Sequence, residues 1–329
     1  MRPFKLIPDN TNIPFLRYRN IAISISLVLI IASIILCVTR GFNLGIDFVG
    51  GQSVRVEFQQ PVKAEDLRER ISALGLGDPT IQEYGSAKEF GIRTPLPAGG
   101  PDAAEKAATK IRTTLEQAYP GAHVGQVESV SGKVSNELFR TGFLSLALAM
   151  IGITIYIWVR FEWQFGVGAL FALFHDVVLT LGFFALTRLE FDLNVVAAIL
   201  TIIGYSLNDT IVVYDRIRED LRKYRKMAIP ELLDLSVNET LSRTIVTSLS
   251  LAMVLAVLLV LGPDVIFGFT ASMLLGIVVG TFSSIYVAAP ILLWLRLKPD
   301  SFVPKEETAA AAAATARKGG KRVDFKDMP

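Results

Sequence analysis

The sequence has few of the residues that build disulfides, metal centres and charged surfaces. Its single cysteine, Cys37, excludes an internal disulfide and any zinc site built on cysteines. The two histidines, His123 and His175, lie far apart, and neither a metal site nor another cofactor is expected. Charged residues make up 19% of the 329 residues, against about 25% in soluble globular proteins. The formal net charge of +2 gives no electrostatic basis for binding nucleic acid, and no P-loop for a nucleotide occurs.

Long apolar runs are the dominant feature of the chain. Hydrophobic residues make up 51% of it, and the mean hydropathy is +0.46. A membrane-spanning helix needs about 20 apolar residues, and six stretches qualify: 20–39, 138–159, 165–186, 192–214, 244–262 and 266–295. The first lacks a small-residue cleavage pattern before Arg40, so it is interpreted as a retained anchor and not a signal peptide. The sequence therefore predicts a polytopic α-helical membrane protein with six transmembrane helices.

Basic residues indicate the orientation of these spans. They gather before the first span, between the fourth and fifth, and after the sixth, whereas only Arg188 follows the third and none follows the fifth. The positive-inside rule then places both termini in the cytoplasm. The predicted divisions are a cytoplasmic N-terminus (1–19), transmembrane helix one (20–39), a periplasmic α+β domain (40–137), transmembrane helices two to six (138–296) and a cytoplasmic basic tail (297–329).

The segment 40–137 has the evenly scattered charges of a soluble domain. Alternating Val54, Val56 and Phe58 indicate a strand, and Ile111 and Leu115 give a later helix an apolar stripe. The expected order is strand 52–58, helix 63–74, strand 80–84, strand 89–94, helix 102–119 and strand 123–130. This βαββαβ order predicts a small ferredoxin-like domain between the first two transmembrane helices.

Polar residues inside the spans point to function, because a charge at the centre of a membrane helix costs about 2.5–3.5 kcal/mol. Asp209 lies within the fourth span and is too short to reach the membrane surface. Beside it, small or polar residues follow helical spacing: Thr201, Gly204, Tyr205 and Asn208. We expect this face to point at other helices or a wet cavity. In contrast, Asp215, Glu219 and Asp220 lie among basic residues and are interpreted as a solvated face.

Two further spans contribute ionisable groups. Arg243 opens the fifth span, followed at helical spacing by Thr247 and Ser250, and the third span contains His175 and Asp176. If spans three to five pack together, two carboxylates and a guanidinium share one interior layer. A nearby arginine holds a buried carboxylate ionised, and separation of the two lets the carboxylate take up a proton. The residues predicted to couple protons are Asp176, Asn208, Asp209 and Arg243.

Other interpretations of these groups stay open. Arg243 could be an interfacial side chain that reaches water, since its span starts there. A purely structural role for Asp176 is a full alternative to a functional one. His175 is more often a packed, hydrogen-bonded residue than a ligand.

Glycines indicate two further features. The pattern GIVVG (276–280), followed by Ser283 and Ser284, predicts close helix packing through Gly276 and Gly280, and Gly204 adds a small position to the fourth span. After the first span, three more glycines surround Asp47: Gly45, Gly50 and Gly51. They predict either turns that lead into the first strand or a hinge between the membrane and the outer domain.

Several of these segments resemble the SecD/SecF family of the bacterial preprotein translocase. GIDFVGG (45–51) is similar to the motif that follows the first span in both subunits. GYSLNDTIVVYDRIRE (204–219) and NETLSRTIVTS (238–248) are similar to spans four and five of SecF subunits in particular, and His175-Asp176 also fits. The likeness covers about residues 20–297, and the small outer domain favours SecF over SecD.

The resemblance implies a six-helix half of a transporter of the resistance-nodulation-division (RND) type, completed by SecD. It implies an auxiliary subunit, not an enzyme, in the bacterial inner membrane beside the SecYEG channel, the SecA motor and YajC. Such a subunit uses the proton gradient to help move preproteins outward. In that family the positions matched by Asp209 and Arg243 are implicated in proton coupling, and Asp176 and Asn208 belong to the same surroundings.

Three rival functions remain to be weighed. A proton-driven RND pump for small molecules or lipids shares the helical plan, but such pumps usually carry both halves and much larger outer domains. An intramembrane aspartyl protease needs two carboxylates in the membrane, whereas Asp78 lies in the outer domain and cannot meet Asp215. A structural scaffold would leave the depth of Asp209 unexplained.

Overall fold

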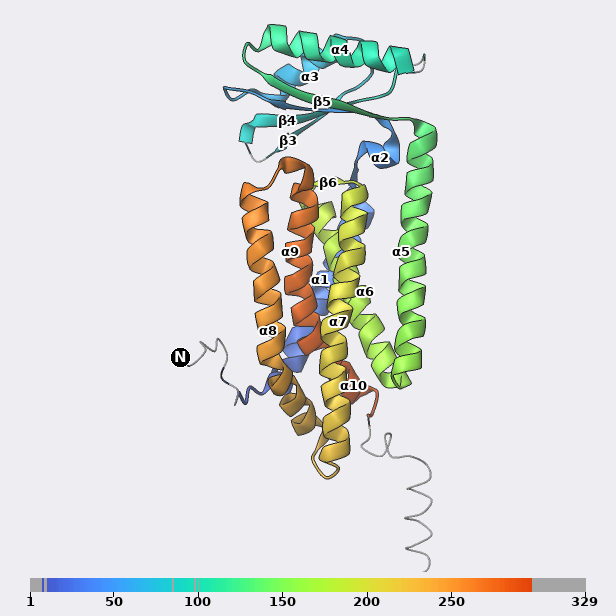
Figure 1. Cartoon of the computed structure of the whole chain (residues 1–329), viewed down its shortest axis with the longest axis vertical. Helices are drawn as coiled ribbons and strands as arrows, with labels where there is room; N and C mark the ends of the chain where they lie inside the picture. The colour runs from blue at the N-terminus through green and yellow to red at the C-terminus, as the bar shows by residue number, and fades with distance from the viewer. Residues whose placement is uncertain (1–7, 9–10, 85, 98, 100, 298–329) are drawn as a thin grey trace, which may run out of the picture.

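The computed structural model describes residues 8, 11–84, 86–97, 99 and 101–297. A helical bundle lies beneath a smaller domain that contains the main β-sheet (Figure 1). The predicted basic tail, apart from Leu297, lies outside the described residues, as does most of the first half of the predicted N-terminal segment 1–19.

Among the described residues, six helices are long and apolar enough to cross a membrane, as predicted. The first is α1 (Arg19–Arg40), preceded by the short 3-10 helix η1 (Phe15–Tyr18). The next four are α5 (Gly132–Arg160), α6 (Trp163–Thr187), α7 (Leu193–Lys223) and α8 (Ile229–Leu261). The sixth comprises α9 (Phe267–Ser283), a π-helical segment η3 (Ser284–Ala288) and α10 (Ala289–Trp294), after a short 3-10 turn η2 (Asp264–Ile266).

Two of these helices extend far beyond their predicted spans at the end away from the outer domain. Arg216, Arg218 and Arg222 therefore lie on α7 and not in a loop. Arg243 lies well inside α8 and not at its start. The cause is an apolar stripe that continues past the spans: Ile217, Leu221, Leu232 and Leu233 are fully buried between the helix ends. The prediction that Asp220 is solvated was wrong, because it is 0% exposed.

The outer domain has the predicted ferredoxin-like topology. Its strands are β2 (Gly51–Glu57), β3 (Thr80–Tyr84), β4 (Ser86–Thr94) and β5 (His123–Val130), all paired antiparallel in the order β3-β4-β2-β5. Helices α3 (Ala64–Ser72) and α4 (Pro101–Ala118) cover the face away from the bundle (Figure 1). The core between sheet and helices includes Val54, Val56, Leu67, Phe90, Ile111 and Leu115.

A small polar junction joins the two parts. Strand β1 (Asn43–Leu44) pairs in parallel with β6 (Glu190–Phe191), and the short helix α2 (Ile46–Val49) follows. From β4 of the outer domain, Arg93 donates hydrogen bonds to the Leu44 carbonyl and the Asn43 side chain, both at 2.5 Å, and lies 3.8 Å from Glu190. The outer domain is therefore held to the bundle by directed polar contacts, which the sequence pattern did not reveal.

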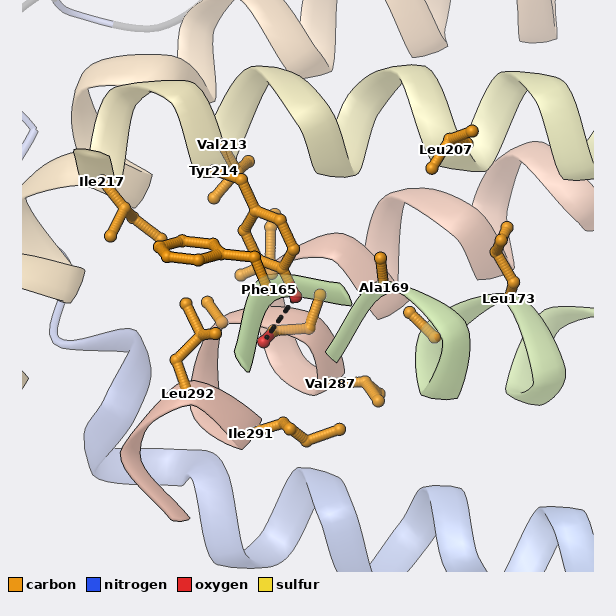
Figure 2. Close-up of a cluster of buried hydrophobic side chains, with 14 of the residues drawn as sticks. Phe165, Ala169, Leu173, Leu207, Val213, Tyr214, Ile217, Val287, Ile291 and Leu292 are labelled. Atoms are coloured by element: carbon orange, nitrogen blue, oxygen red, sulfur yellow. Dashed lines mark hydrogen bonds between the residues drawn. The ribbon is translucent and has the colours of Figure 1, made fainter. Parts of the chain in front are cut away.

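Tyr214 fixes α7 against the π-helical segment in the core of the bundle (Figure 2). Its ring is 1% exposed and stands edge-on to Phe165, with ring centroids 4.9 Å apart. Its hydroxyl donates a hydrogen bond to the carbonyl oxygen of Ala288 at 3.1 Å, the dashed line in Figure 2. Pro290 has no backbone N–H, so the regular helical hydrogen-bond ladder cannot run through this turn, and a π-helical turn occurs instead.

Candidate functional site

Close packing of α9 on α7 positions the candidate site. A Cβ atom on Gly276 would lie 2.4 Å from the side chain of Ile202, and one on Gly280 would lie 3.1 Å from Ser206. A side chain at Gly276 would force the helices apart and one at Gly280 would be tight, which is the packing role expected for small residues in membrane helices. The approach brings the end of α9 between α6 and α7, and there the chain carries Ser283 and Ser284.

Asp176 on α6 is buried, and both of its carboxylate oxygens have polar partners. Its Oδ2 accepts hydrogen bonds from the hydroxyls of Ser206 on α7 at 2.5 Å and Ser283 on α9 at 2.8 Å. Its Oδ1 lies 2.8 Å from Nδ1 of His175. The side chains of His175 and Asp176 are each 1% exposed. Asp176 therefore links three helices through one carboxylate.

Asp209 on α7 lies in the same layer, at 7% exposure. Its Oδ1 accepts a hydrogen bond from Thr244 on α8 at 2.7 Å, and its Oδ2 accepts one from Ser284 at 2.6 Å. The structure thus brings together the two carboxylates that were expected to share a layer. Hydroxyl donors stabilise an ionised carboxylate, and after rotation the same hydroxyls accept a hydrogen bond from the O–H of the neutral form. The arrangement suits a carboxyl group that gains and loses a proton.

Arg243 occupies a different position from the one expected. Its side chain is exposed on the surface of α8, and among the described residues no ion pair joins it to Asp209. Its positive charge nevertheless acts on the Asp209 carboxylate through space. The guanidinium therefore lies beside the buried layer, while the two carboxylates lie within it.

Exposed small and polar residues border this layer on the surface of the isolated chain. We call them the polar seam: Thr201, Gly204 and Asn208 on α7, with Arg243, Thr247 and Ser250 on α8. Asn208 directly precedes Asp209, and Arg243 directly precedes Thr244. The hydrogen bond from Thr244 to Asp209 joins the two helices at this point. Apart from its chain neighbours and the nearby backbone of α7, no described atom lies within 4 Å of the position that a Cβ on Gly204 would take. The helices of this chain therefore leave Thr201, Gly204 and Asn208 of the expected face uncovered, whereas Tyr205 is partly buried, with its hydroxyl 2.9 Å from that of Ser248 on α8.

The glycine motif after the first span connects the outer domain to α7. Oδ2 of Asp47 accepts a hydrogen bond from the backbone N–H of Leu193, the first residue of α7, at 3.0 Å. Gly50 and Gly51 have φ angles of 73° and 122°, and a Cβ on Gly51 would lie 2.7 Å from the Thr94 carbonyl oxygen. A Cβ on Gly45 would lie 2.9 Å from Glu190. The glycines thus form tight turns, and a hinge at this place stays a prediction.

Asp192 completes the cap of α7. Its Oδ1 accepts a hydrogen bond from the backbone N–H of Val195 at 2.9 Å, the usual N-cap contact. Burial raises the pKa of the Asp192 carboxyl, and the neighbouring carboxylates Glu190 and Asp47 act in the same direction, against its hydrogen bonds. Two aspartates from different parts of the chain therefore share the positive end of one helix.

Four hydroxyl residues of the site were not predicted to bind the carboxylates: Ser206, Thr244, Ser283 and Ser284. The sequence pattern indicates Ser283 and Ser284 only as small packing residues. A signal was available for Ser206, which lies one turn before Asp209 in an apolar run. Within the described part of the chain, no group of three or more histidines, cysteines, aspartates or glutamates could hold a metal ion.

The sequence profile described as protein export membrane protein SecD/SecF, C-terminal, matches residues 110–298, and the SecD/SecF GG motif matches residues 35–62. A curated protein translocase subunit SecF from Desulfurispirillum indicum is 47% identical over 288 residues, covering 86% of this chain and 92% of its own. The chain belongs to the SecD/SecF family. A SecF subunit from Cereibacter sphaeroides is 42% identical over 315 residues, covering 93% of this chain and 96% of its own. The resemblance to SecF subunits is confirmed.

Solved structures of SecDF share the fold. The crystal structure of SecDF from Thermus thermophilus matches with a TM-score of 0.80 and 32% identity, covering 89% of this chain. A second SecDF structure, in a super-membrane-facing form, matches with a TM-score of 0.65 and 30% identity. The chain spans 40% and 41% of the lengths of those two chains. It is thus a multi-pass membrane protein with a role in Sec protein translocation.

Proposed function

We propose that this chain is the SecF half of a two-chain, proton-driven auxiliary unit of the Sec translocase. The observation that carries the proposal is Asp209, a buried carboxylate held by two hydroxyl donors beside the uncovered polar seam. A carboxyl group in this setting binds and releases a proton as its surroundings change, without an enzymatic reaction and without a cofactor.

Charge movement through such a site supplies usable energy. Each elementary charge that crosses the membrane is worth about 2.3 kcal/mol per 100 mV. That free energy shifts a two-state equilibrium about fifty-fold. In the proposed cycle, the neutral form of Asp209 favours one packing of the helices, and the ionised form, near Arg243, favours the other. Asn208 and Asp176 shape the surroundings of this carboxylate.

A SecD-type chain is the partner proposed for the polar seam. Exposed Thr201, Asn208 and Arg243 are costly against lipid tails, so a second helical half that covers them lowers the free energy. The SecDF relatives support this, because this chain matches only 40% of the length of one of them. We further propose that the pair works beside SecYEG, SecA and YajC on translocating preproteins.

The proposed location is the bacterial inner membrane, with both termini in the cytoplasm. The basic residues along the end of α7, with Lys226 in the connection after it, support this orientation. The opposite end of the bundle carries the outer domain (Figure 1). The outer domain then lies in the periplasm, where exported chains emerge.

Two measurements test the proposal. Purification of the tagged chain from detergent-solubilised membranes is expected to recover a larger SecD-type membrane protein, and recovery of the chain alone contradicts the pairing. Asp209→Asn is expected to leave insertion and partner binding intact and to abolish the proton-dependent stimulation of preprotein export. Normal export from this variant contradicts the proton-coupling role, and a defect in small-molecule efflux with normal export favours the pump instead.

A further inference from the structure

A second buried carboxylate lies on α7, further from the outer domain than Asp209. Asp220 is 0% exposed, and its Oδ2 accepts a hydrogen bond from Ser236 on α8 at 2.7 Å. Its Oδ1 is buried and makes no hydrogen bond with any described residue. The proposed function does not use this group, although burying a carboxylate here also costs free energy.

Asp220 and Asp209 lie on the same face of α7. Their separation corresponds to about three helical turns, or roughly 16 Å along the axis. Across from them, α8 presents Ser236, Thr240 and Thr244, each one turn after the last. Thr244 donates to Asp209, and Ser236 donates to Asp220. A row of hydroxyls on one helix therefore connects two carboxylates on the next.

The row is enclosed along its whole length. Ser236, Thr240 and Thr244 are 0%, 8% and 2% exposed. Thr240, the middle residue, donates only to backbone carbonyls of its own helix, at 3.0 Å to Ser236 and 3.1 Å to Val237. Such hydrogen bonds to the preceding turn are common for threonine, and they account for the side-chain conformation of Thr240. They do not account for the position of Thr240 between two buried carboxylates.

The far end of the row is rich in carboxylates and open to water. Arg216 forms ion pairs with Asp220 at 3.4 Å, with Glu219 at 2.8 Å and with Glu239. Lys223 at the end of α7 is a further cation, whose charge interacts with that of Asp220. Three carboxylates thus share one guanidinium, and Glu219 and Glu239 are 63% and 31% exposed. This end of the row can hold a proton on a carboxyl group and give it to the solvent.

We infer that Thr244, Thr240 and Ser236 form a relay that carries protons from Asp209 to Asp220, and from there through Glu239 to the cytoplasm. The inference rests on the proposed function. The Cβ atoms of residues one turn apart on a helix are about 5–6 Å from each other, so the relay requires one bridging water molecule between each pair of neighbouring hydroxyls. The neutral Asp209 gives its proton to the Thr244 oxygen and becomes a carboxylate. Each hydroxyl passes its own proton to the next bridging water molecule, which passes one of its protons to the following hydroxyl. The last hydroxyl, that of Ser236, gives its proton to the Asp220 carboxylate.

The test replaces the middle hydroxyl. Thr240→Val keeps the shape of the side chain and removes the hydroxyl, and Thr240→Ser restores it. The matched control is Thr154→Val on α5, where the threonine also donates to the carbonyl one turn before it, at 2.7 Å. The measurement is proton flux into vesicles that contain the chain with its SecD-type partner, followed by a pH-sensitive dye. Melting temperatures of the purified complexes show whether each variant folds.

Thr240→Val is expected to lower the proton flux about tenfold, with Thr240→Ser and Thr154→Val near the wild-type rate. Asp220→Asn is expected to lower the flux as well, while Asp234→Asn, whose carboxylate accepts from the backbone of Leu16, keeps it. Undiminished flux in folded Thr240→Val overturns the relay. If Asp209→Asn abolishes the flux while Thr240→Val and Asp220→Asn keep it, the relay is refuted and the proposed function of Asp209 stands. Undiminished flux in Asp209→Asn overturns the proposed function itself.

Discussion

Ser283 and Ser284 are neighbours in the chain, yet they donate hydrogen bonds to two different carboxylates. Ser283 bonds Asp176 on α6 at 2.8 Å, and Ser284 bonds Asp209 on α7 at 2.6 Å. Successive residues on a helix point about 100° apart, so one helix end between two others reaches both. Movement of this helix end changes both contacts together.

Removing the second of these hydroxyls tests the site at Asp209. Ser284→Ala leaves Oδ2 of Asp209 without its donor and is expected to cost about 1–3 kcal/mol in stability, because a buried acceptor loses its partner. Proton-dependent export is expected to fall with it. The control is Ser272→Ala on α9, a buried serine that donates only to the Phe269 carbonyl. Equal loss of export in the two variants would point to helix packing and away from the carboxylate.

Arg243 is expected to act through its charge. Arg243→Ala should impair proton-dependent export more than Arg243→Lys, since lysine keeps the positive charge beside Asp209. The side chain is exposed, so the isolated chain should fold normally with either residue. Export rates with the proton gradient present and collapsed measure the effect. If both variants are equally impaired, the planar geometry of the guanidinium matters more than its charge.

Glycines on two helices are expected to respond differently to the same change. Gly276→Ala places a methyl group against Ile202 and should cost about 1–3 kcal/mol through overpacking. Gly204→Ala meets no described atom within 4 Å and should fold as well as the wild type. Thermal unfolding in detergent compares them. Gly204→Leu should also fold but should weaken recovery of the SecD-type partner, and full recovery would exclude this face from the interface.

Gly51 is expected to tolerate no side chain. Its φ is 122°, and a methyl group in place of its hydrogen would lie 2.7 Å from the Thr94 carbonyl oxygen. Gly51→Ala should therefore destabilise the outer domain by about 1–3 kcal/mol. Gly75→Ala is the matched control in the same domain, because Gly75 has a φ of 69° and open space around it. It should cost only about 1 kcal/mol. Protease sensitivity of the outer domain in the full chain separates the two.

Asp192 gives a pH dependence with a definite sign. Its pKa is raised in the folded protein, so its ionised form reduces stability at neutral pH, and this penalty disappears as the pH falls to the unfolded-state value. Asp192→Asn keeps an oxygen for the Val195 N–H and removes the charge. It should therefore raise the melting temperature at neutral pH, with a gain that shrinks in mild acid. Asp192→Ala loses the cap and should cost about 1 kcal/mol; a constant gain for Asp192→Asn at all pH values would contradict this account.

Most of the architecture could be predicted because its signals are local. Apolar runs of membrane length indicated the six spans, and alternation at Val54 and Val56 indicated the first strand of the outer domain. The lengths of α7 and α8 were missed because charged residues such as Arg216 interrupt the apolar pattern, although one buried stripe through Ile217 and Leu221 continues beneath them. A hydropathy pattern averages over all sides of a helix and loses such a stripe.

The site was predictable in its carboxylates and not in their partners. Asp209 and Asp176 could be identified from the sequence because a charged residue deep in an apolar span costs free energy on insertion. That cost can be recognised without knowing which helices pack around the residue. The hydroxyl donors depend on which helices meet, and serine and threonine are too common in membrane helices to signal this alone. The exposure of Arg243 follows from the rotation of α8, which no single helix pattern determines.

The hydrogen bond from Leu193 to Asp47 has a mechanical consequence. The helix that bears Asp209 starts on a side chain supplied by the segment leading into the outer domain. A tilt or slide of that helix would therefore displace the base of the outer domain directly, through this contact and the polar junction around Arg93.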